Sequence, residues 1–241
     1  DAVQKMCRHF KDEQVGGVCG AVAVNKTGGG WLGLAESLYW QYDHGLKHSE
    51  SLIAGAVSAQ GSLYAVRREL IGTIPEAMAD DLVISLGVVA AGYRLVFDPT
   101  ALTIESVSSS DTKEFGRRTR STERGWRGLM YYSILLNPFK YGLYSLQLIS
   151  HKVLRRLVPF LFCTGWLASL FLAKTDDFYM WSAWVFSGFI GMGLFGLVAQ
   201  KHLPKVLLLP TFMMMSNIAM MRGVINAMSG KRTVVWVPTR D

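Results

Sequence analysis

Cysteine is scarce in this chain of 241 residues, and the few cysteines do not form a metal-site pattern. The three of them, Cys7, Cys19 and Cys163, are odd in number and far apart, and no CxxC motif or Cys/His ligand spacing occurs. We therefore expect neither a disulfide framework nor a zinc site, and a reducing compartment suits the soluble part. Internal repeats and low-complexity tracts are also absent, so a repeat architecture is not expected.

Acidic residues are rare in the last part of the chain. Residues 1–150 carry 15 Lys+Arg and 15 Asp+Glu, whereas residues 151–241 carry 10 Lys+Arg and only 3 Asp+Glu. The whole net charge of +7 thus comes from the second segment, in a chain that is 50% hydrophobic. Basic residues beside apolar runs are typical of membrane flanks, so nucleic acid is not expected as a partner. We predict a soluble part followed by a membrane part.

The soluble part, residues 1–128, has the mixture of helix and strand patterns that predicts an α/β fold. Apolar residues at positions 2, 3, 6, 7 and 10 predict an opening helix. Because the chain begins in this helix without an initiator Met or a signal peptide, we expect its N-terminus to lie inside a domain. The other predicted elements are strands over 15–25, within 58–70, over 93–99 and over 101–106 (the last two separated by Pro99), a helix over 34–56, a loop and helix over 75–93 that end at Gly92, and a loop over 26–30.

Residues 129–152 are apolar and aromatic but are interrupted by Asn137, Pro138 and Gly142. This pattern predicts an amphipathic segment on a membrane surface rather than one that crosses it. A membrane region is predicted over 153–228, because apolar segments of roughly 20 residues suit helices that cross a bilayer. The apolar segments lie at about 153–173, 178–200 and 206–221, and residues 229–241 form a tail.

Charged residues orient the predicted spans. Lys152, Arg155 and Arg156 place the start of the first span in the cytoplasm by the positive-inside rule. The third segment contains Pro210 and is the shortest, and it is either re-entrant or a crossing that breaks the rule. We therefore predict an integral protein of the cell (inner) membrane with two to three spans and a cytoplasmic soluble domain.

Two neighbouring carboxylates, Asp80 and Asp81, precede the apolar run LVISLGVVAAGY. One interpretation is helix capping, since Asp is favoured at helix starts and suits the positive end of the helix dipole. The other is catalytic: one Asp can cap the helix while its neighbour points into a cleft and takes a proton from a hydroxyl. The residues alone leave both interpretations open.

A basic motif, GRRTR, occupies residues 116–120. It can form a solvated face or a contact with anionic lipid. It can equally bind a diphosphate, because the planar guanidinium fork fits phosphate oxygens and Arg117, Arg118 and Arg120 fall within one helical turn.

Weaker candidates lie earlier in the chain. Gly61, in the loop SAQGSLYAV, either allows a ligand to approach the backbone or simply makes a turn. Tyr39, Trp40 and Tyr42 could stack on a sugar ring, although their helical spacing is more typical of core residues. The histidines show no metal spacing.

These pieces, in this order, resemble the membrane-bound family 2 glycosyltransferases, above all the branch with the cellulose, hyaluronan and poly-N-acetylglucosamine synthases. The resemblance is carried by five segments rather than by any single motif. They are DAVQKMCRHFKDEQVGGVCGAVAVN, YWQYDHGLKHSESLIAGAVSAQGSLYAVRREL, MADDLVISLGVVAAGYRLVFDPTALTIES, KEFGRRTRSTERGW and LNPFKYG…SHKVLRRLVP.

The resemblance implies a partial GT-A (Rossmann-like) glycosyltransferase domain that uses a nucleotide-sugar donor, a UDP-sugar first among them. It implies an inverting transfer, with Asp81 as general base and Asp80 as its acidic neighbour. Arg117, Arg118 and Arg120 would hold the diphosphate. It also implies a divalent cation, Mg2+ or Mn2+, a saccharide or lipid-linked acceptor and polysaccharide synthesis at a lipid bilayer.

The chain departs from the family pattern in two places. The arginine motif is usually QxxRW, whereas here Arg117 takes the first position and Ser121 follows Arg120. Trp126 lies six residues beyond Arg120 and is the aromatic candidate for the acceptor, together with Gln60 and Gly61. The donor-binding half and the cation ligands are expected upstream of residue 1, so residues 1–241 alone are expected to be inactive. The alternative is a non-catalytic membrane scaffold or transport partner with a degenerate transferase domain.

Overall fold

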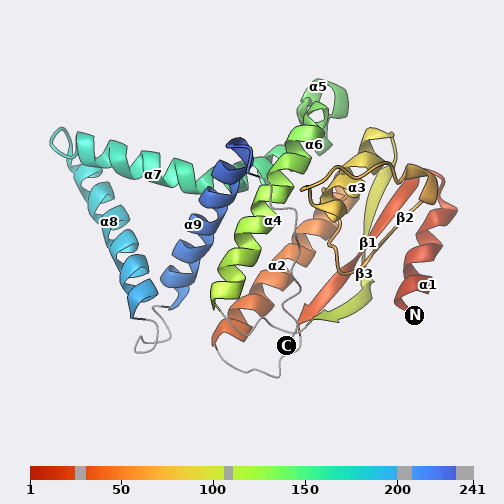
Figure 1. The fold of residues 1–241 in the computed structure, drawn as a ribbon, viewed down its shortest axis with the longest axis horizontal. Coiled ribbons are helices and arrows are strands. Elements are labelled where there is room, and N and C mark those ends of the chain that lie inside the picture. The colour runs from red at the N-terminus through yellow and green to blue at the C-terminus, as the bar shows by residue number, and fades with distance from the viewer. Residues whose placement is uncertain (25–30, 106–110, 200–207, 232–241) are drawn as a thin grey trace. The chain divides into compact units, whose positions relative to one another are not determined.

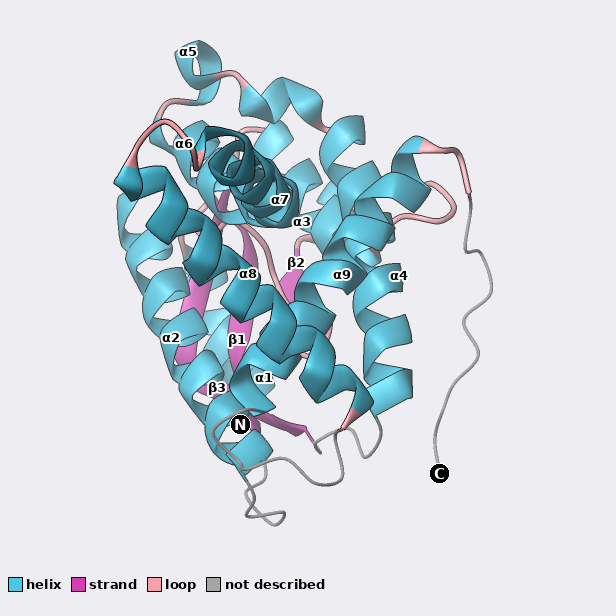
Figure 2. Cartoon of the chain, turned by 90° about the vertical axis from the view of Figure 1, so that its left-hand side faces the viewer, coloured by secondary structure: helices cyan, strands magenta, loops and turns pink. Residues whose placement is uncertain are grey.

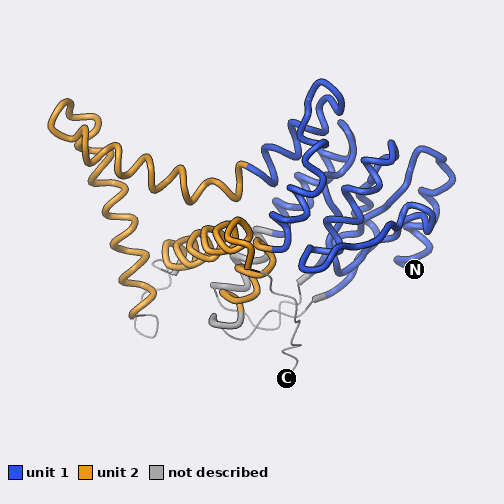
Figure 3. Tube along the Cα trace, turned by 45° about the horizontal axis from the view of Figure 1, so that its top comes forward, with its two compact units in different colours: residues 1–109, 124–153, 232–241 blue, residues 110–123, 154–231 orange. Residues whose placement is uncertain are grey.

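The computed structural model describes residues 1–24, 31–105, 111–199 and 208–231. The chain divides into two units, and helix α4 (Asp111–Tyr131) belongs partly to each of them. Unit 1 contains residues 1–109, 124–153 and 232–241, and unit 2 contains residues 110–123 and 154–231 (Figure 3). In the described residues, unit 1 is mixed α/β and unit 2 is helical (Figure 2). The predicted loop over 26–30 and most of the predicted tail lie outside the described residues.

Unit 1 contains the strands and helices that the apolar pattern predicts in outline. Its strands are β1 (Val15–Val24), β2 (Tyr64–Val66) and β3 (Arg94–Glu105). Its helices are α1 (Ala2–Cys7), η1 (Arg8–Lys11), α2 (Trp31–Ile53), η2 (Arg68–Leu70), α3 (Asp80–Ala90), η3 (Ser133–Leu136), α5 (Pro138–Tyr141), α6 (Leu143–Leu148) and the π-helix η4 (Ile149–Leu154), together with the second half of α4. Gly92 follows α3 with φ +87°, a conformation that glycine adopts without strain and that ends the helix as predicted.

Within the described residues, the sheet has three strands in the order β2-β1-β3 (Figure 1). The small and β-branched residues of VGGVCGAVAV put β1 at its centre, where it pairs antiparallel with β2 and parallel with β3. The parallel pairing follows from the crossover through α2 and α3 that separates the two strands.

β3 is a single strand, and the prediction of two strands separated by Pro99 is wrong. Gly20 of β1 pairs with Asp98 and the next residue, Ala21, pairs with Leu102, so residues 99–101 have no partner in the β1 ladder. Proline has no N–H to give to a ladder, and the irregularity in register places it where none is needed. The strand therefore continues past the proline instead of ending there.

Both faces of the sheet are covered, because successive side chains of a strand point to opposite sides. Val18 of β1 joins Met6 of α1 in one buried cluster. Cys19, the next residue, joins Phe97 in a second cluster. The Phe97 amide also donates to Oγ of Ser51 on α2 at 3.0 Å, which fixes that helix to the second face. Figure 1 shows α1 and α2 on opposite sides of the strands.

The segment over 129–152, expected to lie on a membrane surface, begins with the end of α4 and continues through the short helices η3, α5, α6 and η4. Asn137 caps α5 by accepting a hydrogen bond from the Phe139 amide at 3.0 Å, and Gly142, with φ +56°, separates α5 from α6. One side of the segment is buried in a cluster with α3, made of Val57, Leu82, Leu86, Leu129, Leu135, Tyr144 and Leu148. Its other side leaves large apolar side chains exposed, namely Met130, Tyr131, Ile134, Phe139, Leu143 and Leu146.

Unit 2 contains the first half of α4 and the helices α7 (Arg155–Leu172), α8 (Asp177–Val198) and α9 (Leu208–Met228). Phe162 of α7 packs edge-on against Phe186 of α8, with ring centroids 4.9 Å apart. A side chain at Gly193 of α8 would collide with Met214 of α9, since its β-carbon would stand 2.8 Å from the Met214 Cβ. Small residues thus let these helices approach closely.

Two helices of the described residues are long and apolar enough to cross a membrane, namely 143–172 and 177–198. Their apolar side chains face outward to an unusual degree, with Phe171, Trp184 and Val198 among the exposed ones. The predicted crossings stay a prediction, because this criterion rests on length and composition alone.

Candidate functional site

The two aspartates open helix α3, but neither is its cap. Ala79 occupies the N-cap position and offers no side-chain hydrogen bond, so Asp80 and Asp81 are the first two helical residues. The simple capping interpretation is therefore wrong in its detail. Asp81 is half-buried and its Oδ1 accepts a hydrogen bond from the Leu82 amide at 2.8 Å, whereas Asp80 is exposed. Both carboxylates lie at the positive end of the helix dipole.

Gly61 lies directly against Asp81. A β-carbon at Gly61 would stand 3.6 Å from Oδ2 of Asp81, and this is the nearest atom that it would meet. The neighbouring Gln60 has a buried side-chain oxygen with no hydrogen-bond partner in the described part of the chain. Two of the residues that the sequence selects for acceptor and base are thus brought together in unit 1, with no side chain between the loop and the carboxylate.

Ser85 connects these two segments and was not predicted. Its hydroxyl donates to the Asp81 carbonyl at 2.6 Å and accepts from the Ala59 amide at 2.9 Å, and the side chain is fully buried. The bond to Asp81 follows from helix geometry, in which a serine reaches the carbonyl four residues back. The spacing of four residues is enough to predict the bond from Ser85 to the Asp81 carbonyl, whereas the bond to Ala59 depends on the tertiary fold.

Tyr64 of β2 also belongs to the surroundings of the aspartates. Burial raises the pKa of its phenol, and the negative charges of Asp80 and Asp81 raise it further. The hydroxyl therefore stays protonated near neutral pH and remains able to donate a hydrogen bond.

The arginine motif lies on the part of α4 that belongs to unit 2, where a carboxylate holds two of its three members. Glu114 accepts two bonds from Arg117, at Nε and Nη2, both 2.7 Å, and one from Arg118 Nε at 2.6 Å. Burial alone raises the pKa of Glu114, but the hydrogen bonds and charges of the two arginines outweigh it and lower that pKa. Arg120, half-buried, makes no hydrogen bond or ion pair with any described residue.

Two cation–π contacts connect the same part of α4 with α9 inside unit 2. The Arg118 guanidinium lies 4.7 Å from the ring centroid of Phe212, and the Arg222 guanidinium lies 6.0 Å from that of Phe115. Gly223 of α9 completes this packing, because its β-carbon would stand 2.7 Å from the Thr119 carbonyl oxygen. The third apolar segment is therefore partly covered by the arginine-bearing helix.

The predicted site residues are divided between the units. Asp80, Asp81, Gln60 and Gly61 belong to unit 1, as does the half-buried Trp126 of α4, while Arg117, Arg118 and Arg120 belong to unit 2. The hypothesis that carboxylate and arginines serve one site stays a prediction. No group of three or more His, Cys, Asp or Glu side chains that could hold a metal ion occurs among the described residues.

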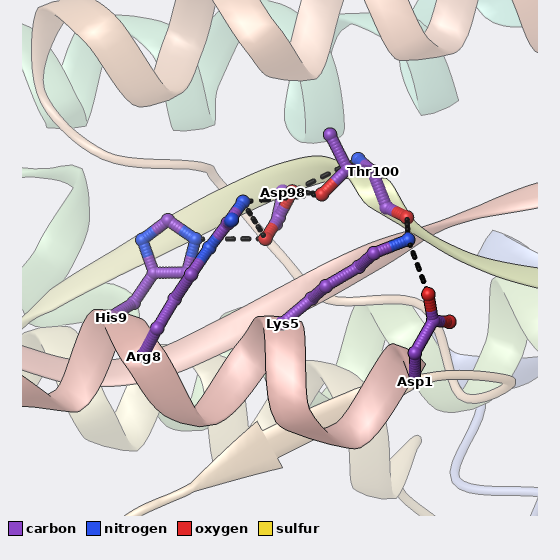
Figure 4. Close-up of polar contacts among 6 residues, drawn as sticks. All are labelled: Asp1, Lys5, Arg8, His9, Asp98 and Thr100. Carbon is purple, nitrogen blue, oxygen red and sulfur yellow. Dashed lines mark hydrogen bonds and ion pairs between the residues drawn. The ribbon is translucent and has the colours of Figure 1, made fainter.

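A separate polar cluster fixes the N-terminal helix to β3 (Figure 4). Asp98, only 2% exposed, accepts bonds from Arg8 at 3.1 Å, from His9 at 2.9 Å and from the Thr100 hydroxyl at 2.7 Å. Burial by itself raises the pKa of Asp98, but the hydrogen bonds of Thr100 and His9 and the charge of Arg8 bring it down to about 2. Each oxygen of the carboxylate has a partner, which indicates a structural role.

Comparisons with a family model and with solved structures agree. A family model described as glycosyl transferase family group 2 matches residues 1–226. The chain is also similar to the solved structure of mannosyltransferase PcManGT from Pyrobaculum calidifontis in complex with GDP-Man and Mn2+, with 16% sequence identity and a TM-score of 0.50. This match covers 96% of the chain and 59% of that structure's chain, so the chain spans only part of its length. No curated protein gives a match. These matches confirm the prediction of a mixed α/β, GT-A-like fold.

Proposed function

The chain belongs to glycosyl transferase family group 2, and we propose that it serves the transfer of a sugar from a nucleotide-sugar donor to a saccharide acceptor, with inversion at the anomeric carbon. Asp81 is the proposed general base and Asp80 its acidic neighbour. We further propose a UDP-sugar as donor and polysaccharide synthesis at the cell membrane as the role.

One observation supports this function above the others: a β-carbon at Gly61 would stand 3.6 Å from the Asp81 carboxylate, and glycine has none. A general base must lie within hydrogen-bond reach of the hydroxyl that it deprotonates. At the loop position beside the carboxylate, no side chain stands in the way of such a hydroxyl. The buried, unpartnered oxygen of Gln60 in the same loop provides an acceptor for a second sugar hydroxyl.

In the proposed reaction, an acceptor hydroxyl oxygen attacks the anomeric carbon of the donor sugar while its proton passes to Asp81. The new glycosidic C–O bond forms as the bond from the anomeric carbon to the diphosphate oxygen breaks. The electron pair of that bond leaves with the nucleoside diphosphate. Donors aimed at this developing charge lower the barrier, which is the role we propose for Arg117, Arg118 and Arg120.

The membrane location is part of the proposal. Helices α7 and α8 carry exposed apolar side chains, Lys152 precedes α7, and Arg155 and Arg156 are the first two residues of α7. Such an arrangement suits two crossings with the transferase domain in the cytoplasm. The exposed apolar side of the segment over 129–152 would then lie in the membrane surface.

The experiment is turnover of defined donors by the full-length protein in membranes. UDP-glucose, UDP-N-acetylglucosamine and GDP-mannose are supplied separately with Mg2+ or Mn2+, and sugar incorporation and nucleoside diphosphate release are measured. We expect incorporation from one UDP-sugar with equimolar UDP release. Turnover of GDP-mannose alone would replace the donor assignment, and no turnover of any donor would contradict the catalytic function. Turnover by residues 1–241 alone would refute the expected inactivity of this part.

One observation favours the alternative of a non-catalytic membrane scaffold or transport partner. Glu114 already occupies donor groups of Arg117 and Arg118, which a diphosphate would otherwise use. A scaffold has no need to bind nucleotide, so UDP binding to the full-length protein, measured by calorimetry, separates the two hypotheses. Binding with a dissociation constant in the micromolar range supports the transferase, and absence of binding supports the scaffold.

A further inference from the structure

We propose that Arg124 is a positioning residue that holds the acidic loop, residues 77–81, in the geometry that Asp81 needs. The inference rests on the proposed function, in which Asp81 is the general base. Arg124 lies outside the GRRTR motif, in the half of α4 that belongs to unit 1 together with the loop itself. It reaches the loop from 43 residues further along the chain (124 − 81).

Arg124 is joined to the acidic loop by two hydrogen bonds that run in opposite directions. Its Nε donates to the Met78 carbonyl at 2.9 Å. Its own backbone carbonyl accepts from the Ala79 amide at 3.4 Å. The first is a bond from a charged donor, which is stronger than a bond between neutral groups. Together they connect both sides of the Met78–Ala79 peptide region to α4, immediately before Asp80.

Ser85 holds the end of the loop through the Asp81 carbonyl, whereas the bonds of Arg124 are made at Met78 and Ala79, before the helix starts. The N-cap of α3 is Ala79, a residue that cannot cap with its side chain. Serine, threonine, aspartate or asparagine is preferred at such a position because each satisfies a free backbone amide. Ala77 has φ +58°, a left-handed conformation that costs energy in a residue with a β-carbon. An uncapped helix start beside a strained residue needs an external contact to keep one conformation.

The segment that carries Arg124 is itself firmly packed against α3. Gly128, one helical turn further along α4, lies so close to α3 that a β-carbon there would stand 3.2 Å from Cγ2 of Val83. Leu129 is fully buried in the same cluster as Leu82 and Leu86. The guanidinium of Arg124 is therefore presented from a fixed helix surface, as a positioning residue requires.

Loss of Arg124 should lower kcat rather than weaken donor binding. If Arg124 fixes the loop, its loss displaces the base from the acceptor hydroxyl without removing any group that contacts the donor. A displacement of about 1 Å at a reacting group can lower the rate by about a hundredfold. The loss therefore falls on kcat, whereas the KM for the donor stays within about twofold.

The test uses the full-length protein with Arg124→Ala, Arg124→Lys and, as a matched control, Arg94→Ala. Arg94 is an exposed arginine of unit 1 at the start of β3 and has no part in the proposed site. Transfer is measured with the donors named above, with and without added guanidinium chloride at low millimolar concentration. We expect Arg124→Ala to lower kcat by about tenfold or more, Arg124→Lys to lower it less, and guanidinium to restore part of the activity of Arg124→Ala only.

A second readout does not depend on activity. Hydrogen–deuterium exchange of the amides over 77–83 should be about tenfold faster in Arg124→Ala than in wild type, and unchanged in Arg94→Ala. Equal exchange and equal kcat in the two alanine variants would overturn the inference while leaving the transferase function intact. A wild-type protein that turns over no donor would defeat the proposed function instead, and the exchange contrast would still decide whether Arg124 holds the loop. Loss of kcat in Arg124→Ala without rescue by lysine or guanidinium would show a merely structural role and would also overturn it.

Discussion

Gly61 lies against the carboxylate of Asp81, with its missing β-carbon 3.6 Å from Oδ2. The two residues come from different elements: Gly61 from the loop that leads into β2, and Asp81 from the first turn of α3. Ser85 holds the two elements together through its bonds to Asp81 and Ala59. A side chain at position 61 would therefore extend towards the proposed base.

Gly61→Val should lower kcat/KM for the acceptor by about tenfold, because a branched side chain would fill the space in front of the Asp81 carboxylate. Gly72→Val is the matched control, since a β-carbon at Gly72 meets nothing within 4 Å. Neither glycine has a positive φ, so backbone strain does not distinguish the two variants. Steady-state transfer with varied acceptor checks the prediction, and equal kinetics of the two variants would contradict it.

Glu114→Gln should tighten UDP binding by about threefold to tenfold. The carboxylate occupies Nε and Nη2 of Arg117 and Nε of Arg118, and a neutral amide competes less well than a carboxylate for these donors. The lowered pKa of Glu114 means that the competing charge persists below the ordinary range for a glutamate and is lost only in acid. Calorimetry with UDP measures the effect, and Glu76→Gln, an exposed carboxyl remote from the arginines in sequence, is the control. Weaker binding in Glu114→Gln would show that the carboxylate orients the arginines instead of competing with the diphosphate.

Asp98 should contribute acid-sensitive stability. Its pKa falls from 3.8 to about 2 on folding, so the stabilisation is complete above about pH 4 and is lost as the pH falls towards 2. The shift corresponds to about 2 kcal/mol of unfolding free energy. Asp98→Asn should therefore lower the thermal midpoint at neutral pH and flatten its decline between pH 4 and 2.

Glu69→Gln provides the control for Asp98, because Glu69 is exposed and should leave the acid-dependent decline unchanged. An Asp98→Asn protein with the same pH dependence as wild type would contradict the assignment of Asp98 as the buried, fully bonded carboxylate.

Local pattern predicted much of the fold. The small and β-branched run over 15–25 became the central strand, and the apolar run closed by Gly92 became α3. These two predictions succeed because periodicity and glycine conformation act over short distances along the chain. The prediction that Pro99 separates two strands failed because whether a proline ends a strand depends on the partner strand. Here β1 accommodates the proline through a shift in register.

The sequence identified the side chains of the candidate site, but only some of the contacts between them. Asp81 and Gly61 were both selected, and the fold brings them together. Ser85 and Arg124 were missed, since each acts through bonds to a segment distant in sequence. Glu114 was missed as a partner of the arginines although its spacing of three and four residues on a helix was a visible signal.

The central claim is tested most directly by Asp81→Asn beside Asp80→Asn in single-turnover transfer with donor saturating. Asparagine keeps the size of the side chain and its bond to the Leu82 amide, but it cannot accept the acceptor's proton at neutral pH. The account predicts that Asp81→Asn lowers the transfer rate by about a hundredfold to ten-thousandfold with UDP affinity unchanged, whereas Asp80→Asn loses far less. Transfer at the wild-type rate in Asp81→Asn, above all if Asp80→Asn is the inactive variant, would contradict it.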